Sequence, residues 1–446
     1  MRFVGYPHQT KGLMGRFVGI AALCVALTPA LSVAADFFVN CHGVPAAVNF
    51  QTIQAAIDAA TTRRGAREIQ ICRGTYAENL VIDHGGKLTL TGQSRHGVTL
   101  TGIPGTAGPI IDILGTVNQV RIAHLTVDGQ AQLTADGEPI FGIRSTRGAE
   151  LYRVHVRNIR DASNDNVAGL GVAFIGDCCE GEDCEGEDGE RGSTLRSKVL
   201  HSDFSGNSRV SILADGCNVI LEARKNHIEA PESPRLAHDG IQVSRGARGR
   251  ITHNTVRNAL GTGQPSGEVA SEGSGIIAFC PGDLPSTLIM DNTVRGSGVG
   301  IAIVDAGGVR ATGNNLRSNR TGIARQVIGN IFGTSPCQLP LSDRRNVMMN
   351  NSIRNSEEFG FHFISFDQAV GIPENDRFFD NDIRNSGLEG GHVFEGNNLL
   401  IRDNSIRRTQ VGFDLVDETA GGGTSGTANI YRRNDCESSF PDRLCD

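Results

Sequence analysis

The sequence predicts an all-β solenoid, a coil built from many short strands. A frame of Asn-x-apolar, a few polar or glycine residues, and then Gly-apolar-x-apolar recurs through most of the chain, and residues 290–303 are its clearest copy. Copies begin 22 residues apart at Asn292 and Asn314 and 23 residues apart at Asn381 and Asn404. The apolar residues alternate two by two, so each segment is expected to be a strand with one buried face.

Asparagine and glycine hold fixed corner positions in this frame. Asparagines of successive rungs can stack into an internal ladder, in which each side chain satisfies backbone groups of its neighbour. We expect the glycines to supply positive φ angles at the turns. Together these features resemble the right-handed parallel β-helix of the pectate-lyase type, over roughly Glu68 to Asn434. The resemblance implies the fold, but this fold hosts many activities.

A capping helix is predicted ahead of the rungs, over about residues 51–62. Ile53, Ala56, Ile57 and Ala60 share one helical face there, which can cover the apolar end of the coil. The rungs then occupy about residues 68–434, and a disulfide-bearing tail covers residues 435–446. The strands after the helix are similar to the opening of pectin methylesterases, but the segments with that family's catalytic aspartates are missing. We expect a single β-helix domain over residues 36–446.

Residues 1–35 have the pattern of a signal peptide, with an apolar run from Phe17 to Leu27 and small residues before Asp36. A retained membrane anchor is the rival interpretation, although the run is short for a spanning helix. No later stretch reaches membrane length, so no membrane span is expected in the mature chain. The expected location is secreted or periplasmic.

Ten of the eleven cysteines lie after the predicted signal peptide. An even number of cysteines in an exported chain favours disulfides over metal binding. By position alone, Cys41 with Cys72, Cys280 with Cys337, and Cys436 with Cys445 are plausible pairs. No cysteine and histidine spacing resembles a zinc site, so no metal site is predicted from these residues.

The composition restricts the partners. Lys and Arg number 42 against 49 Asp and Glu, a net charge of −7, and removal of Arg2, Lys11 and Arg16 with the signal peptide makes the mature chain about −10. That balance argues against nucleic acid as a partner. The chain has no tryptophan and four tyrosines, so the usual aromatic platforms for sugar rings are scarce.

Two loops interrupt the rungs. Residues 177–191 crowd seven carboxylates and three cysteines after Asp177, and a calcium site between Glu180 and Glu190 is one interpretation of them. The other is a solvated loop pinned by disulfides, which we favour because the spacing matches no known calcium loop. The second loop, from Gly261 to Gly273, can form the wall of a groove.

The residue x of each Gly-apolar-x-apolar strand points outward, so these residues form a stripe along the coil. His238 and Asp239 precede Gly240 at a strand edge. The resemblance implies a catalytic role for them, because β-helix hydrolases and epimerases carry catalytic acids at this edge. A local turn is the alternative role for this pair. Gln242, Ser244 and Arg245 follow in the same rung. We name His238, Asp239 and Arg245 as catalytic candidates, and Gln242 and Ser244 as substrate-binding candidates.

Farther along the stripe, His362 is a further catalytic candidate, and Asp414 is its conceivable partner in a later rung. Arg325 is, with Arg245, the cation expected nearest the stripe, and both Arg325 and Asp414 are named as substrate-binding candidates. The small residues Ala302 and Ala324 are expected to leave an open track for a sugar between Gly240 and Gly322.

Two functions stay open at this point. The resemblance implies action on an extracellular polysaccharide by lyase, hydrolase or epimerase chemistry. The alternative is a non-catalytic surface or adhesion protein that binds glycan or protein along the face of the coil. A cluster of convergent titratable groups on the stripe would favour the enzyme.

Overall fold

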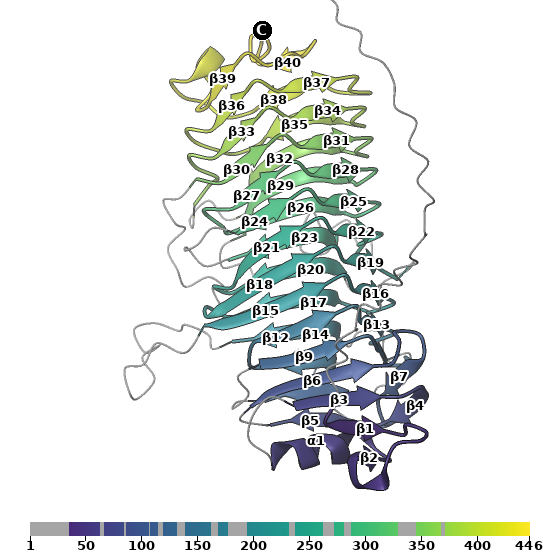
Figure 1. Cartoon of the computed structure of the whole chain (residues 1–446). Coiled ribbons are helices and arrows are strands. Elements are labelled where there is room, and N and C mark those ends of the chain that lie inside the picture. Colours follow the sequence, from purple (N-terminus) through teal and green to yellow (C-terminus); the bar gives the residue numbers. More distant parts are fainter. Residues whose placement is uncertain are drawn as a thin grey trace, which may run out of the picture. The chain divides into compact units, whose positions relative to one another are not determined.

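The computed structural model describes residues 35–62, 67–83, 86–106, 108–114, 119–131, 139–161, 168–176, 194–231, 237–261, 272–280, 287–328, 345–366 and 371–446. Residues 35–446 form one compact unit. Three parallel sheets make up this unit, and each rung contributes one strand to each sheet (Figure 1).

The first sheet has 15 strands in the described residues. In spatial order it contains β2 (Asn49–Phe50), β1 (Phe37–Val39), β3 (Arg67–Ile71), β6 (Lys87–Gly92), β9 (Gln119–Ala123), β12 (Ala149–Tyr152), β15 (Leu195–Leu200), β18 (Val219–Arg224), β21 (Arg248–Thr252), β24 (Leu288–Met290), β27 (Arg310–Thr312), β30 (Val347–Met349), β33 (Arg377–Phe379), β36 (Leu400–Arg402) and β39 (Ile430–Arg432).

The second sheet has 12 described strands, all of them short. It contains β4 (Gly74–Ala77), β7 (Val98–Thr101), β10 (Thr126–Asp128), β13 (His155–Arg157), β16 (Asp203–Ser205), β19 (His227–Glu229), β22 (Thr255–Arg257), β25 (Thr293–Arg295), β28 (Asn315–Arg317), β31 (Ser352–Arg354), β34 (Asp382–Arg384) and β37 (Ser405–Arg407).

The third sheet has 13 described strands. It contains β5 (Leu80–Ile82), β8 (Ile111–Ile113), β11 (Ile140–Ser145), β14 (Gly169–Ile175), β17 (Val210–Asp215), β20 (Asp239–Ser244), β23 (Ser274–Phe279), β26 (Val299–Val304), β29 (Thr321–Val327), β32 (Phe359–Ser365), β35 (Glu389–Val393), β38 (Leu415–Asp417) and β40 (Ser439–Phe440).

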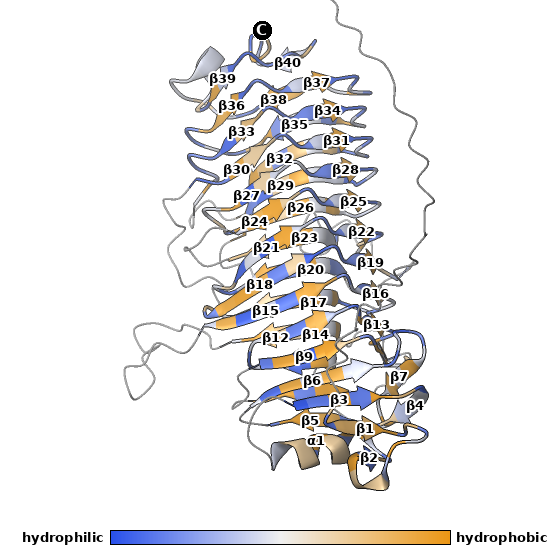
Figure 2. Cartoon of the chain, in the orientation of Figure 1, coloured by the Kyte–Doolittle hydropathy of each residue, from blue (hydrophilic) through white to orange (hydrophobic). Residues whose placement is uncertain are grey.

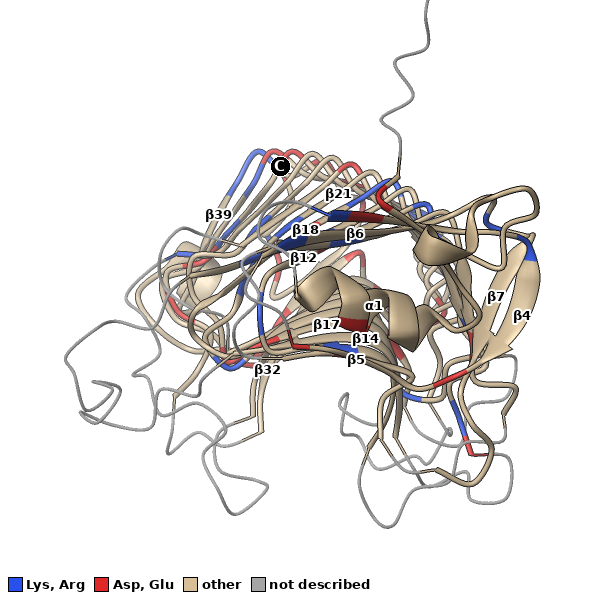
Figure 3. Cartoon of the chain, turned by 60° about the horizontal axis from the view of Figure 1, so that its bottom comes forward, with Lys and Arg blue, Asp and Glu red and all other residues tan. Residues whose placement is uncertain are grey.

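The order of the strands confirms a parallel β-helix. Each sheet takes every third strand along most of the chain, and neighbouring strands pair in parallel. Figure 3 shows the three sheets as three sides of the coil, seen from the end that carries the helix. In Figure 2 the turns beside β28, β31, β34 and β37 are mostly hydrophilic, because these corners face water.

The interior of the coil is the core. Ile301, Ile303, Phe361 and Phe363 are at most 1% exposed, which confirms the predicted two-residue alternation in these rungs. In the last predicted rung the alternation is wrong, because Phe413 is 44% exposed while Leu415 is buried.

The predicted asparagine ladder is present at one corner. The side-chain amide of Asn314 donates to Asn351 Oδ1 at 3.0 Å and to the carbonyl of Ile289 at 3.0 Å. The same pattern links the buried residues Asn226, Asn254, Asn292, Asn314, Asn351, Asn381, Asn404 and Asn434. Amides with both donor and acceptor groups can satisfy buried turns in this way.

The glycines of the Gly-apolar-x-apolar strands have a different role from the predicted one. Positive φ angles fall instead at corner residues just before the ladder, such as Asp291, Gly313 and Asn350. A Cβ atom on Gly300 would lie 2.5 Å from the carbonyl oxygen of Gly322, and one on Gly322 would lie 2.4 Å from that of Gly360. Glycine is needed there because the next rung leaves no room for a side chain.

The capping helix is confirmed as α1 (Ile53–Thr61). The Thr52 hydroxyl accepts a hydrogen bond from the Ala55 amide, as expected for an N-cap. The predicted apolar face of α1 is buried against β1, β2, β3 and β5. Among the described residues, 3₁₀ turns occur at Ala46–Val48, before α1, and at Thr424–Gly426, in the connection between β38 and β39. None of the helices in the described ranges is long and apolar enough to cross a membrane.

Disulfides pin both ends of the coil. Cys41 is bonded to Cys72, and Cys436 to Cys445, as predicted. Cys217 and Cys280 also belong to disulfides, although Cys337, the predicted partner of Cys280, lies outside the described residues. Disulfides of this kind indicate an extracytoplasmic location. The acidic loop 177–191, most of the loop 261–273 and all of the signal-peptide prediction except Ala35 also lie outside them.

Candidate functional site

The predicted stripe corresponds to one outward column of the third sheet. Its members are Val81, Asp112, Arg144, Ala173, Leu213, Gln242, Ile277, Ala302, Ala324, His362, His392, Val416 and Phe440. The column includes two of the candidates, Gln242 and His362, and adds His392 next to His362.

The middle of the stripe is covered, so the expectation of an open track there is wrong. Ala302 and Ala324 are at most 1% exposed, and they belong to an apolar cluster on the outer face with Val299, Val304 and Ile328. A sugar cannot lie against these two alanines, because other apolar side chains already do.

Asp239 lies at the outward edge of β20 but is only 5% exposed. Its Oδ1 accepts a hydrogen bond from the Ser274 amide at 2.9 Å, and its Oδ2 lies 3.4 Å from the Arg209 guanidinium. Burial raises the pKa of Asp239, and the charge of Arg209 opposes this increase. The carboxyl is therefore tied to protein partners on both oxygens.

His238 is fully buried, so it does not face a groove. Its Nε2 lies 3.3 Å from the Ser211 hydroxyl, whose own side chain is also buried. Burial, together with the nearby charge of Arg209, lowers the pKa of His238 to about 3. The side chain is thus a neutral, enclosed imidazole, which favours the alternative of a local structural role.

Arg245, Ser244 and Gln242 meet around Asp215 of the preceding rung. Arg245 Nε donates to Asp215 Oδ1 at 2.7 Å, its second nitrogen also contacts Asp215 Oδ2, and the Ser244 hydroxyl donates to Asp215 Oδ1 at 2.9 Å. Gln242 Nε2 donates to the Ser244 hydroxyl at 3.3 Å. The Arg245 side chain is 50% exposed, so this network can present a guanidinium to a ligand but offers no base.

Arg325 faces the inside of the coil, and its expected place beside the stripe is wrong. It aligns with Ile303 and Phe363, whose side chains point into the core. Arg325 Nε donates to Asp376 Oδ2 at 2.9 Å, and both side chains are at most 5% exposed. An inward arginine paired in this way cannot reach a polysaccharide on the surface.

Asp414 lies beside the stripe instead of on it. Leu415 aligns with Gly391 and Val416 with His392, so Val416 is the outward residue of that rung. The Asp414 carboxylate accepts hydrogen bonds from the Thr409 hydroxyl and the Glu437 amide, at 2.7 and 2.8 Å. It closes a turn two rungs from His362 and is not its partner.

His362 and His392 stand side by side on the outward face of β32 and β35. Their ring centroids are 5.3 Å apart, and Phe359 stacks on His362 with centroids 4.6 Å apart. His392 Nδ1 lies 2.8 Å from Glu389 Oε2, and its Nε2 lies 3.2 Å from Glu418 Oε1. Two carboxylates therefore orient His392, whereas His362 has no hydrogen-bond partner in the described residues.

The pKa values of the two imidazoles are shifted in opposite directions. Burial, and then the charge of His392, lowers the pKa of His362 to about 4. Burial also disfavours the charged form of His392, but the hydrogen bonds and charges of Glu389 and Glu418 outweigh it and raise its pKa. The pair therefore combines an imidazole that stays neutral above about pH 4 with one whose protonated form is stabilised relative to an ordinary histidine, the arrangement typical of acid–base catalysis.

Exposed phenylalanines lie beside this pair and on the rungs that follow it. Phe394 lies 6.0 Å from the His392 ring, and Phe413 and Phe440 pack together with centroids 6.1 Å apart. Phe394, Phe413 and Phe440 are between 44% and 55% exposed. In a chain without tryptophan and with four tyrosines, the exposed aromatic rings at this end of the coil are phenylalanines.

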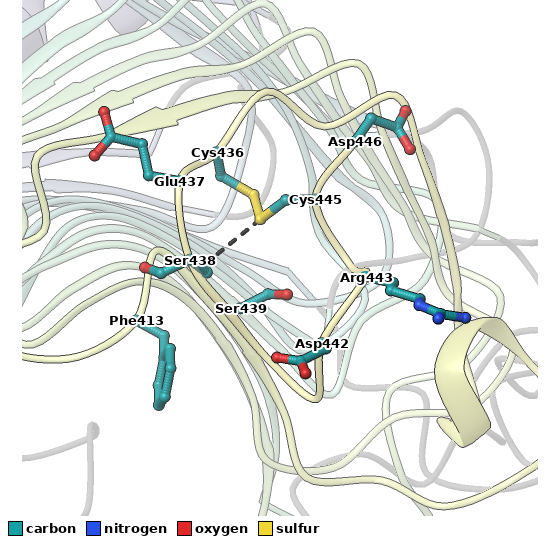
Figure 4. Close-up of a pocket in the computed structure, with 9 residues that line it drawn as sticks. All are labelled: Phe413, Cys436, Glu437, Ser438, Ser439, Asp442, Arg443, Cys445 and Asp446. Atoms are coloured by element: carbon teal, nitrogen blue, oxygen red, sulfur yellow. Dashed lines mark hydrogen bonds between the residues drawn. A yellow bond between two sulfur atoms is a disulfide. The ribbon is translucent and has the colours of Figure 1, made fainter.

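A depression of about 500 Å³ lies at the carboxyl-terminal end of the coil. Figure 4 shows that the Cys436–Cys445 disulfide and the chain around it form its lining, with Phe413 at one side. Asp442 and Arg443 also line it, and the candidate Asp414 borders it through its hydrogen bonds with Glu437 and Ser438, which belong to the lining. We regard it as a feature of the tail.

Within the described ranges no group of three or more His, Cys, Asp or Glu side chains is arranged to hold a metal ion. The calcium interpretation concerns Glu180 to Glu190, which lie outside those ranges.

Comparison with solved structures places the coil among known folds. It is similar to the A-module of mannuronan C-5 epimerase AlgE4 from Azotobacter vinelandii, with a TM-score of 0.51 and 16% identity, covering 87% of this chain and 94% of that one. The chain has the parallel β-helix fold of that epimerase module.

Two further likenesses of this β-helix protein are weaker. The catalytic unit of an α-1,3-glucanase from Streptomyces thermodiastaticus aligns with a TM-score of 0.48 and 12% identity, over 87% of this chain and 67% of that one. A probable pectinesterase A from Neosartorya fischeri is 29% identical over 152 residues, which are 34% of this chain and 41% of the pectinesterase. No protein-family model matches the sequence.

Sequence reasoning found His362 but missed His392, Glu389 and Glu418. The rung around Gly391 has two consecutive glycines, which hid the register. The sequence did contain a signal for this residue, because His392 stands directly after Gly391. Pairing Gly391 with Phe361 aligns His392 with His362.

Proposed function

We propose that this β-helix protein acts on an extracytoplasmic polysaccharide at the outward face of β32, β35 and β38. The observation that carries the proposal is the pair His362 and His392, two adjacent imidazoles with opposite pKa shifts on a surface rich in exposed aromatic rings. Acid and base groups whose environments separate their pKa values are the usual sign of proton-transfer chemistry.

The roles follow from the surroundings of each ring. His362 is neutral at physiological pH and has no hydrogen-bond partner in the described residues, so it acts as the general base that removes a proton from the sugar or from water. His392 is oriented by Glu389 and Glu418 and favours the protonated form, so it acts as the general acid. This pairing suits lyase, hydrolase or epimerase chemistry.

The phenylalanines supply the binding surface. Sugar rings present apolar C–H faces that pack on aromatic rings. Phe394 offers such a face beside His392, and Phe413 and Phe440 offer two more farther along the same end of the coil. Binding energy spread over neighbouring sugars can then position one unit against His362.

The test starts with a screen of the purified chain against uronic-acid and neutral polysaccharides, measuring unsaturated products, reducing ends and epimerised residues. On the substrate found, His362→Ala and His392→Ala should each lower kcat/KM by about a hundredfold or more. The control is His253→Ala, because His253 is half-exposed in an ion pair with Asp291 on another face of the coil.

Full turnover by His362→Ala would refute the assignment of the base. If polysaccharide binds but no product forms with any polymer, the non-catalytic adhesion function is correct and the proposed enzymatic function is not.

A further inference from the structure

The second sheet carries an uninterrupted column of six arginines. Arg257, Arg295, Arg317, Arg354, Arg384 and Arg407 are aligned in register on β22, β25, β28, β31, β34 and β37, which stack one above the other in Figure 1. Parallel strands are about 4.8 Å apart, so the column extends about 24 Å along the coil. We call it the arginine ladder.

The ladder faces outward. The residue before each of its arginines is an aliphatic side chain at most 1% exposed in the core. Since side chains alternate along a strand, the arginines must lie on the other face. Arg295, Arg317, Arg384 and Arg407 are exposed, and Arg257 and Arg354 are about 40% exposed.

A second column of small polar residues runs beside the ladder on the same face. Its members are Thr255, Thr293, Asn315, Ser352, Asp382 and Ser405. None of them has a bulky side chain, so the face formed by the two columns is flat and hydrophilic.

Only part of the positive charge is neutralised. Glu229 lies 3.9 Å from Arg257, Asp382 is shared by Arg354 and Arg384, and Asp435 pairs with Arg407.

At the centre of the ladder no carboxylate of the described residues lies within ion-pair distance of Arg295 or Arg317. The Nε of Arg317 donates to Asn315 Oδ1 at 2.8 Å instead. The ladder therefore concentrates uncompensated positive charge at its centre, in a chain whose net charge is −7.

Equal spacing, a straight course and guanidinium groups restrict the partner. A guanidinium binds carboxylates and sulfates through paired N–H donors. A pyranose ring is about as long as one rung is high, so an extended glycan with an anionic group on each sugar can meet one arginine per rung. Its hydroxyl groups can bond the neighbouring polar column.

Other anionic partners fit less well. The phosphate backbone of a nucleic acid duplex winds away from a straight ladder, so it can contact only part of the six arginines. A membrane surface would need apolar side chains to insert beside the arginines, and the adjacent column has only small polar residues.

We propose that the arginine ladder is a binding surface for an extended carboxylated or sulfated polysaccharide, separate from the acid–base pair on the third sheet. It holds the protein on an anionic glycan. This inference does not depend on the proposed enzymatic function.

The test compares two triple variants by biolayer interferometry at low ionic strength, with immobilised polygalacturonate, dextran sulfate, neutral dextran and a DNA duplex as probes. The ladder variant is Arg295→Gln/Arg317→Gln/Arg354→Gln. The matched control replaces Arg250, Arg310 and Arg377 by Gln. These three arginines are exposed, but they alternate with Leu288 and Val347 on the first sheet.

The His362→Ala background is used for all proteins, so that turnover does not consume the probe and the result is independent of catalysis. The ladder variant should bind one or both anionic polymers about tenfold or more weakly than its parent. The control should differ by less than about threefold. Neutral dextran should not bind through this face, and added salt should weaken the parent more than the ladder variant.

Three results would overturn the inference: no binding of either anionic polymer by the parent, equal losses in the ladder variant and the control, or tighter binding of DNA than of both glycans. If the triple ladder variant melts earlier than its parent, the double variant Arg295→Gln/Arg317→Gln replaces it. These two side chains have no carboxylate partner among the described residues, and their loss should still weaken binding about fivefold.

Discussion

Replacing Asp376 by Asn should destabilise the coil far more than a typical polar substitution. Asp376 is 1% exposed and lies inside the coil, where its Oδ2 accepts the hydrogen bond from Arg325 Nε at 2.9 Å. The variant keeps an oxygen for the Asn346 amide, which donates to Asp376 Oδ1 at 2.8 Å, but it leaves the Arg325 charge buried and unpaired. Removal of one partner of a buried ion pair costs about 3 to 5 kcal/mol.

A double variant isolates the ionic part of this cost. Arg325→Met/Asp376→Asn removes both charges and places an apolar side chain between Ile303 and Phe363, with which residue 325 is aligned. Its free energy of unfolding should lie within about 1 kcal/mol of the natural chain, because well-packed apolar residues often replace buried ion pairs without loss. The cost of Asp376→Asn alone should therefore exceed that of the double variant by at least about 2 kcal/mol.

Urea unfolding at pH 7, followed by far-ultraviolet circular dichroism, measures these free energies. The midpoint and the slope must both be compared, because a coil of repeats can lose cooperativity. A loss below about 1 kcal/mol in Asp376→Asn, or a double variant as unstable as this single one, would refute the reasoning.

Three further predictions concern the core, the end of the coil and the rival site. Phe361→Ala should lower the free energy of unfolding in urea by about 3 to 5 kcal/mol, and a loss below about 0.5 kcal/mol would contradict the register of the rungs. Cys41→Ser/Cys72→Ser should lower the free energy of unfolding by about 2 to 5 kcal/mol; unchanged stability would show that this bond does not hold the capped end. Asp239→Asn should lower the Tm but keep kcat/KM within about threefold of the natural value, since its partners are structural; a hundredfold loss at unchanged Tm would move the site to Asp239.

The fold could be predicted because its determinants are periodic. Asn292, Asn314, Asn351, Asn381 and Asn404 repeat at one corner, and their ladder is formed by amide groups that no other residue type provides as well. The helix face of α1 followed from the spacing of its four apolar residues in the same way.

The candidate site could be predicted only in part, because its register depends on contacts between rungs. Arg325 occupies a position that is apolar in neighbouring rungs, and the partner that permits this, Asp376, is 51 residues away. The glycine doublet before His392 and the turn closed by Asp414 shifted the alignment of the last rungs. The sequence pattern alone cannot show such pairings, whereas the register of the strands in the structure does.

The arginine ladder of the second sheet also could not be predicted from the sequence pattern alone. Thr-Val-Arg at residues 293–295 and Ser-Ile-Arg at residues 352–354 are visible in the sequence, but an arginine after an apolar residue is usually an isolated surface charge. Only the register across six strands shows that these arginines form one continuous ladder.

The pH dependence of kcat/KM on the active polysaccharide tests the central claim most directly. His362 must be neutral to act as a base, so activity should rise with pH through about 4. His392 must be protonated to act as an acid, so activity should fall as the pH rises through the raised pKa of His392, above the ordinary histidine value near 6.5. His392→Gln should retain the rising limb and lose the falling one. A falling limb that persists in His392→Gln, or a rising limb that stays unchanged in His362→Ala, would contradict the assignment of this pair as the catalytic acid and base.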